Sequence, residues 1–85
     1  MSYSIKIEKI AVKQLKKLPR PEQKRISKKI QALEQNPRPR DCTKLQGETN
    51  LYRIRSGSYR VIYTIQDTEL IVRVIRVGHR SSIYG

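Results

Sequence analysis

The sequence predicts an α+β domain with the element order β-α-α-β-β-β, in which two helices pack on one face of an antiparallel sheet. Three observations support this class. Polar and apolar residues alternate at residues 3–7, apolar residues recur at helical spacing across residues 11–33, and three alternating segments follow residue 51. A chain of 85 residues is the size of one small domain, so residues 1–85 are expected to fold as a single unit.

The first half of the chain is predicted to contain one strand and two helices. The strand covers residues 3–7, where every second side chain is apolar. Helical spacing of apolar residues at 11–18 predicts the first helix, which Pro19 ends. Pro21 suits the first turn of the second helix, because a proline there loses no helical hydrogen bond.

The second helix is predicted to bury a stripe formed by Ile26, Ile30 and Leu33. It ends before Pro37, because the residue that precedes a proline avoids the helical region. Residues 37–48 contain two prolines and a glycine and are predicted to form a loop.

Three strands with short connections are predicted at residues 51–55, 59–66 and 69–77. The last two are joined by a two-residue turn at residues 67–68. This turn gives two facing pairs on the core side, Val61–Val74 and Tyr63–Val72. Arg73 and Arg76 on the last strand are expected to be solvated or ion-paired.

Strand alternation predicts that Arg53, Arg55 and Arg60 share one face of the sheet. If residues 56 and 57 form the turn, Arg53 lies opposite Arg60, and if residues 57 and 58 form it, Arg55 does. Like charges this close are unfavourable in isolation. With no carboxylate predicted on this face, the cluster is expected to bind an anion from outside.

The charge of the chain indicates which anion. The net charge is +12, from 19 lysines and arginines against seven acidic residues, which suits nucleic acid. From residue 51 onward the chain contains arginines but no lysine. Residues 70–85 contain no acidic side chain. Because arginine presents a planar fork that matches two phosphate oxygens, these features predict a phosphate-binding site.

The same composition argues against a metal or a cofactor. A two-metal nuclease needs acidic ligands, and one histidine, His79, with one cysteine, Cys42, cannot build a zinc site. A lone cysteine fits a reducing cytosol, and no segment has the apolar length of a signal peptide or a membrane span. We therefore expect a cytoplasmic protein with no metal, no cofactor and no membrane.

Phosphoryl transfer without a metal needs a nucleophile, and the simplest one belongs to the substrate. RNA carries a 2′-hydroxyl beside its own phosphate, whereas DNA does not. Clustered arginines would stabilise the charge that develops on the phosphate. The sequence therefore favours RNA cleavage by internal attack.

Residues 51–63 (LYRIRSGSYRVIY) and 77–84 (VGHRSSIY) resemble RelE toxins of the RelE/ParE superfamily. Residues 11–18 (AVKQLKKL) and 44–47 (KLQG) are also similar, so the resemblance covers nearly the whole chain. It implies a ribosome-dependent endoribonuclease that cleaves mRNA in the A site. It also implies a small acidic antitoxin that inhibits the enzyme in a hetero-oligomeric complex.

The resemblance assigns roles to three residues and shows a departure from the family at two others. Arg60 corresponds to the phosphate-stabilising arginine, and Arg80 to the arginine that stabilises charge or protonates the leaving 5′-oxygen. Tyr84 corresponds to the tyrosine that stacks on or orients the nucleotide. Arg53 and Arg55 stand where well-studied RelE toxins have lysines. Because arginine keeps its proton, Arg53 is expected to clamp phosphate and to be a poor general base.

Two groups of residues have open alternatives. His79 is either the base that accepts the 2′-proton or a tail residue that packs or binds RNA backbone. The helix lysines either contact ribosomal RNA phosphates or form an ordinary solvated surface: Lys13, Lys16, Lys17, Lys24, Lys28 and Lys29.

Two other functions fit the same fold. One is a ParE-like inhibitor of DNA gyrase, which needs no nuclease site. The other is a non-catalytic RNA-binding module, which would bind RNA without producing new ends.

Overall fold

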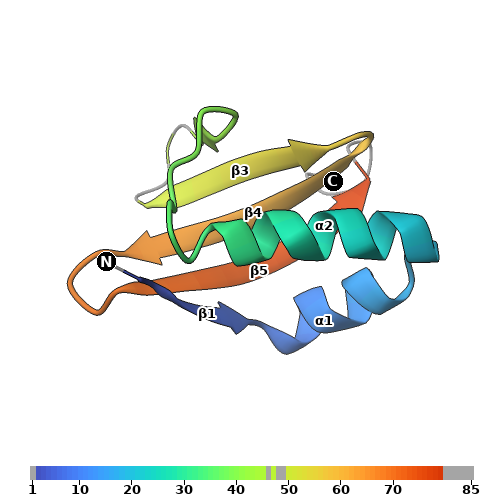
Figure 1. The fold of residues 1–85 in the computed structure, drawn as a ribbon, viewed down its shortest axis with the longest axis horizontal. Coiled ribbons are helices and arrows are strands. Elements are labelled where there is room, and N and C mark those ends of the chain that lie inside the picture. The colour runs from blue at the N-terminus through green and yellow to red at the C-terminus, as the bar shows by residue number, and fades with distance from the viewer. Residues whose placement is uncertain (1, 46, 48–49, 80–85) are drawn as a thin grey trace.

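The computed structural model describes residues 2–45, 47 and 50–79, and these form two helices and five strands (Figure 1). The elements run in chain order as β1 (Ser4–Ile7), α1 (Lys9–Lys16), α2 (Arg20–Ala32), β2 (Thr43–Lys44), β3 (Leu51–Ser56), β4 (Tyr59–Gln66) and β5 (Ile71–His79). The α+β class and the predicted helices are confirmed. The short β2 lies inside the segment predicted as a loop, where two residues are too few to show alternation.

The strands pair in the order β1-β5-β4-β3-β2. The prediction of an antiparallel sheet is wrong at one edge, because β1 runs parallel to β5, with Ile5 opposite Val72 and Ile7 opposite Val74. Parallel neighbours need a crossover connection, and here α1, α2 and the following strands lie between β1 and β5 in the chain. The other three pairings are antiparallel.

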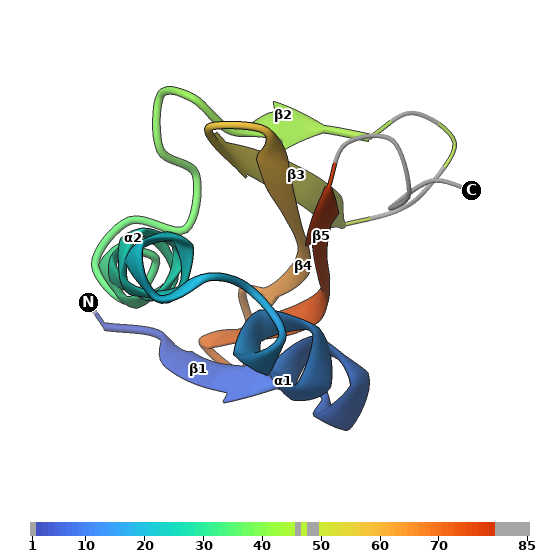
Figure 2. The same ribbon diagram turned by 90° about the vertical axis from the view of Figure 1, so that its right-hand side faces the viewer.

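Both helices lie on the same side of the sheet (Figure 2). The predicted apolar stripe faces the sheet. Ile26 and Ile30 of α2, and Leu33 directly after its last residue, are almost completely buried. The side-chain amide of Gln23 in α2 donates hydrogen bonds to the backbone carbonyls of Lys16 and Leu18. It thereby supplies donors to carbonyls that α1 leaves without a helical partner at its C-terminal end. The core consists of Ala11, Ile26, Ile30, Leu33, Tyr52, Ile54, Val61, Tyr63, Ile65, Val72, Val74 and Val77.

The register between β4 and β5 differs from the predicted one. The connecting turn spans residues 67–70, with Gln66 opposite Ile71 and with Leu70 at a positive φ of 56°. Tyr63 therefore faces Val74 instead of Val72. The register shifts again between Ile62 and Tyr63, so that Val61 faces Val77 instead of Val74.

A polar network ties the turn after β4 to the segment after α2. Asp67 accepts hydrogen bonds from both Arg38 Nη atoms, at 3.2 and 2.8 Å, and from the Tyr3 hydroxyl at 2.7 Å. The hydrogen bond from Arg38, followed by that from Tyr3, lowers the pKa of Asp67 to about 2. The Arg38 guanidinium also lies 5.3 Å from the centre of the Tyr52 ring.

Below this network, Tyr63 anchors the segment after α2 to the core. Its side chain is fully buried, and its hydroxyl donates to the Pro37 carbonyl at 2.8 Å. Burial raises the pKa of the Tyr63 hydroxyl.

Neither α1, with eight residues, nor α2, with thirteen, has the apolar length needed to cross a bilayer.

Candidate functional site

The sheet surface opposite the helices, here called the arginine face, carries the predicted arginine cluster. In the register of β3 and β4, Arg55 lies opposite Arg60 and Arg53 lies opposite Ile62. Residues 57 and 58 form the turn, which confirms the second of the two predicted registers. Gly57 takes a positive φ of 61° at the first turn position, as a type II′ hairpin turn requires.

The arginines of this face surround a buried aliphatic side chain. Ile62 is only 6% exposed, although strand alternation directs it to the opposite side of the sheet from its core neighbours Val61 and Tyr63. The Nε atom of Arg53 and the Nε and Nη1 atoms of Arg60 are buried, whereas Arg55 is exposed. The fold therefore removes part of each of these two guanidinium groups from solvent.

One edge of the arginine face departs from the prediction that no carboxylate is present. Arg73 pairs with Lys6 of β1 and also with Thr64 of β4, and its Nη1 atom lies 3.7 Å from a carboxylate oxygen of Glu8. This contact confirms the expected ion pairing of Arg73. Sequence alternation could not reveal it, because Glu8 follows a strand whose neighbour comes more than sixty residues later.

Arg55 lies in a different electrostatic setting. Within residues 2–45, 47 and 50–79, no carboxylate is in an ion pair with it. Across the same residues, no three histidine, cysteine or acidic side chains gather as a metal site would require. The arginine face therefore offers cationic donors, and its chemistry suits an anion.

The structure separates His79 from the arginine cluster. His79 pairs with Tyr59 at the end of β5, and their rings meet edge to face with centroids 5.7 Å apart. Paired residues share a face, so His79 lies on the side of the sheet that carries the helices, opposite Arg60. The two remaining predicted site residues, Arg80 and Tyr84, lie outside the described residues.

The predicted lysines of the helices fall into two classes. Five of them are exposed on α1, α2 or the link between them: Lys13, Lys16, Lys17, Lys24 and Lys28. Lys29 instead connects α2 to two other segments. Its Nζ atom donates to Asp41 at 2.8 Å and to the Arg55 carbonyl of β3. The hydrogen bond from Lys29 lowers the pKa of Asp41.

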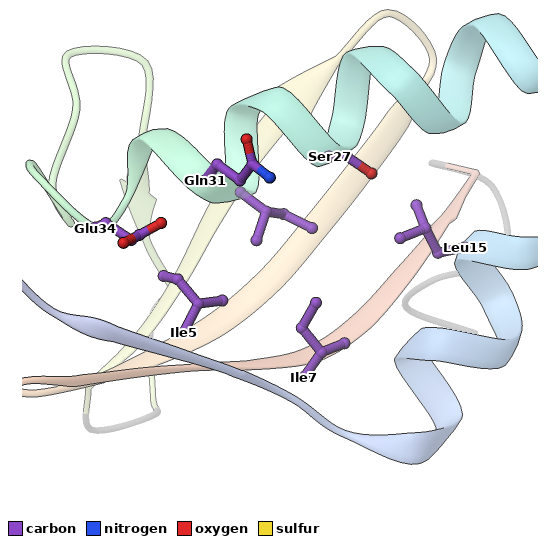
Figure 3. A pocket seen from close by; sticks show the side chains of 7 residues that line it. Ile5, Ile7, Leu15, Ser27, Gln31 and Glu34 are labelled. Atoms are coloured by element: carbon purple, nitrogen blue, oxygen red, sulfur yellow. The ribbon is translucent and has the colours of Figure 1, made fainter.

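A second surface feature lies on the helix side of the sheet. An open groove of about 320 Å³ runs between β1, α1 and α2, with apolar walls from Ile5, Ile7 and Leu15 (Figure 3). Ser27, Gln31 and Glu34 line its other side. The groove was not predicted from the sequence, because its walls come from three elements that are separated in the chain.

Comparison with known proteins gives relatives along the whole length of the chain. The family profile described as the ParE toxin of the type II toxin–antitoxin system parDE matches residues 5–84. The chain is 33% identical over 89 residues to the mRNA interferase toxin RelE of Escherichia coli K12. The alignment covers 100% of this chain and 93% of that protein.

Solved structures agree with these relatives. The archaeal RelE–RelB complex from Pyrococcus horikoshii OT3 contains a chain with a TM-score of 0.85 and 36% identity, covering 96% of this chain and 99% of that chain. The intact Escherichia coli RelBE toxin–antitoxin complex gives a TM-score of 0.81 and 31% identity, covering 92% and 96%. The arrangement of two helices on a five-stranded sheet is therefore one that experimentally determined RelE structures share.

Proposed function

Because this chain belongs to the RelE/ParE superfamily of type II toxins, we propose that it is an endoribonuclease that cleaves mRNA in the ribosomal A site. The observation that supports this proposal best is the arginine face itself. Arg53, Arg55 and Arg60 lie together on a sheet surface that no helix covers, where an RNA strand can approach. Cleavage of A-site mRNA would stop translation. We propose that the protein acts in the cytoplasm, where the ribosomes are.

We propose a reaction that uses the 2′-hydroxyl of the substrate and no metal. The 2′-oxygen attacks the adjacent phosphorus, the bond to the 5′-oxygen breaks, and the products are a 2′,3′-cyclic phosphate and a 5′-hydroxyl. Arg60 stabilises the charge on the phosphoryl oxygens, while Arg53 and Arg55 hold the phosphate. By the resemblance, Arg80 stabilises the charge on the leaving 5′-oxygen, which takes its proton from water because arginine keeps its own, and Tyr84 orients the nucleotide.

The acceptor of the 2′-proton is the open step of this mechanism. Arg53 keeps its proton and is unsuited to the role. His79 is suited by its chemistry, but its ring packs against Tyr59 on the other side of the sheet from Arg60. His79 therefore acts as the base only if the end of β5 turns toward the arginine face.

A cognate antitoxin is the second part of the proposal. The similar structures from Pyrococcus horikoshii and Escherichia coli are RelE–RelB or RelBE complexes. We propose a hetero-oligomeric complex with a small acidic protein, because the net charge of +12 favours an acidic partner. Ribosomal RNA is also an anionic partner, and we propose that it binds the exposed lysines of the helices.

End mapping on ribosomes tests the nuclease assignment. Purified protein is added to ribosomal complexes with a defined codon in the A site, and the RNA ends are analysed chemically. We expect cleavage within that codon, with 2′,3′-cyclic phosphate or 3′-phosphate and 5′-hydroxyl ends. A 2′-deoxy nucleotide at the scissile position should prevent cleavage. Products with 5′-phosphate ends, or cutting of the deoxy substrate, would contradict internal attack.

A ParE-like gyrase inhibitor is the alternative, since the matching family profile is that of ParE toxins. The two functions separate when supercoiling by DNA gyrase is assayed beside translation. Loss of supercoiling with intact mRNA would favour the alternative. Binding of RNA without new ends and without any effect on gyrase would indicate a non-catalytic RNA-binding module.

A further inference from the structure

A β-bulge in β5 changes the direction of one arginine. Ile62 of β4 faces Arg76 and Tyr63 faces Val74, so Ile75 is an extra residue in β5. Simple alternation from the buried Val74 would point Arg76 toward the helices. The extra residue places Arg76 on the arginine face, and Val77 returns to the core with 1% exposure.

A side chain from α1 holds the bulged strand in place. The Oε1 atom of Gln14 accepts a hydrogen bond from the backbone N–H of Val77 at 2.8 Å. A bulge interrupts the ladder of backbone hydrogen bonds, and a partly buried N–H needs another acceptor. Gln14 supplies that acceptor directly after Arg76, so α1 helps to set the direction of this arginine.

Arg76 differs from Arg73, the other arginine of β5. Both lie on the arginine face, but Arg73 is ion-paired with Glu8 and Arg76 is in no ion pair with any residue that the structure describes. Arg76 is also exposed. A guanidinium that the fold directs to a cationic surface, without a carboxylate to balance it, is available to an anionic ligand.

The position of Arg76 relative to Arg60 indicates what it binds. Arg60 faces Gly78, which has no side chain, and Arg76 is two residues before Gly78 on the same strand. Such diagonal neighbours lie about 7–8 Å apart, within reach of long side chains. Arg53, Ile62 and Arg76 form a row across three strands, so that Arg76 extends the cluster toward β5.

We propose that Arg76 is a substrate-binding residue that holds the mRNA phosphate adjacent to the scissile one, and that Gln14 positions it through the bulge. This inference rests on the proposed nuclease function and adds a second phosphate contact to it. Arg60 stabilises the reacting phosphate, whereas Arg76 fixes the register of the strand. Its loss should therefore weaken substrate binding more than the chemical step.

The test compares Arg76→Ala with Arg73→Ala in the ribosomal cleavage assay. Both changes remove one positive charge from the same face of the same strand. We expect Arg76→Ala to raise KM about tenfold, with kcat changed less than about threefold. The salt dependence of RNA binding should lose about 0.7 of a unit in its log–log slope. Arg73→Ala should leave KM and the slope close to wild type, and Arg76→Lys should recover part of the loss.

A Gln14→Leu variant tests the positioning role. It removes the acceptor for the Val77 N–H at similar side-chain volume, and we expect KM to rise in the same direction as for Arg76→Ala. In the Arg76→Ala background, Gln14→Leu should change KM no further, because its effect acts through Arg76. Thermal unfolding of each variant shows whether it is folded.

The outcomes separate this inference from the proposed function. If wild-type protein cleaves and Arg76→Ala behaves like Arg73→Ala, the inference is wrong and the nuclease assignment stands. If wild-type protein does not cleave A-site mRNA at all, the proposed function fails first. Additive KM effects of Gln14→Leu and Arg76→Ala would overturn the positioning role of Gln14.

Discussion

At the scale of single residues, burial distinguishes Arg53 and Arg60 from the exposed arginines of the same face. Arg60 has two buried guanidinium nitrogens, and Arg55 faces it from the next strand. Electrostatic interactions are stronger where water is excluded, so a phosphate beside Arg60 gains more than one beside an exposed side chain. We therefore expect Arg60 to be the arginine whose substitution lowers the cleavage rate most.

Arg60→Ala should lower the rate of A-site cleavage by about 100- to 1000-fold, as expected when one donor to a transition-state oxyanion is lost. Arg60→Lys keeps the charge but loses the fork, and its rate should lie between those of wild type and Arg60→Ala. Single-turnover cleavage on ribosomal complexes measures the chemical step. Equal losses in ribosome affinity and cleavage rate would show that Arg60 only docks the protein.

Asp67 gives a prediction for stability against pH. Its pKa is about 2 in the folded protein because of Arg38 and Tyr3, against an ordinary value of 3.8. The lowered pKa means that the ionised carboxylate stabilises the fold above about pH 4, and that this contribution is lost as the pH falls toward 2. Urea unfolding from pH 5 to pH 2 should show a smaller decline for Asp67→Asn than for wild type.

Glu69→Gln is the matched control for Asp67→Asn. Glu69 lies in the same turn and is in no ion pair with the described residues. This substitution leaves the contacts of Asp67 with Arg38 and Tyr3 in place. Asp41, whose pKa Lys29 also lowers, leaves part of the acid sensitivity in every variant. Identical profiles for Asp67→Asn and wild type would contradict the role of the Arg38–Asp67 contact.

At the scale of secondary-structure elements, the β3–β4 hairpin fixes which arginines meet. Its turn depends on the positive φ of Gly57, a conformation that costs other residues about 1–2 kcal/mol. Gly57→Ala should therefore lower the free energy of unfolding by about 1 kcal/mol, measured by urea unfolding. Ser58→Ala, at the exposed neighbouring position, should change it by less than about 0.5 kcal/mol. Equal effects would mean that the turn tolerates a side chain at residue 57.

Local patterns were sufficient to predict the helices and the first hairpin. The stripe of Ile26, Ile30 and Leu33 repeats at helical spacing, and the glycine at residue 57 restricts the hairpin to two registers. The arginine cluster follows from these registers, because alternation gives the same face in both. These features depend on neighbouring residues, and the sequence displays such neighbours directly.

The β4–β5 pairing and the sheet edges could not be predicted in the same way. Leu70 adopts a positive φ without being glycine, and the bulge at Ile75 has no residue signature of its own. The parallel pairing of β1 with β5 joins residues more than sixty positions apart. The side-chain contact from Gln14 to Val77 is equally distant in the chain. Tertiary packing decides each of these features.

At the scale of the whole molecule, positive charge extends over two surfaces with different roles. The arginine face carries the proposed chemistry, while exposed lysines lie on the helix side of the sheet. Neutralising nucleic-acid phosphates releases counterions, so affinity carried by such lysines depends strongly on salt. The helix lysines are therefore expected to control ribosome binding with little effect on the cleavage step.

A Lys24→Ala, Lys28→Ala double variant tests this division. Both side chains are exposed on α2, so we expect normal stability, weaker ribosome binding and a salt slope reduced by about 1.4 to 1.8. Lys29→Ala should instead lower stability, because it breaks contacts with Asp41 and the Arg55 carbonyl. Equilibrium binding over a range of salt concentrations gives the slope, and urea unfolding gives the stability. An unchanged salt slope in the double variant would show that Lys24 and Lys28 do not contact ribosomal RNA and form an ordinary solvated surface.

The position of β5 has a consequence for how the protein is made. β5 follows every other described element in the chain, yet it lies between β1 and β4 in the sheet. A nascent chain that has not reached Ile71 lacks Val72, Val74 and Val77 from its core and has no strand to join β1 to the β3–β4 hairpin. The sheet can close only after this segment has been synthesised. The order of synthesis therefore delays closure of the sheet until the ribosome has translated the codons for β5.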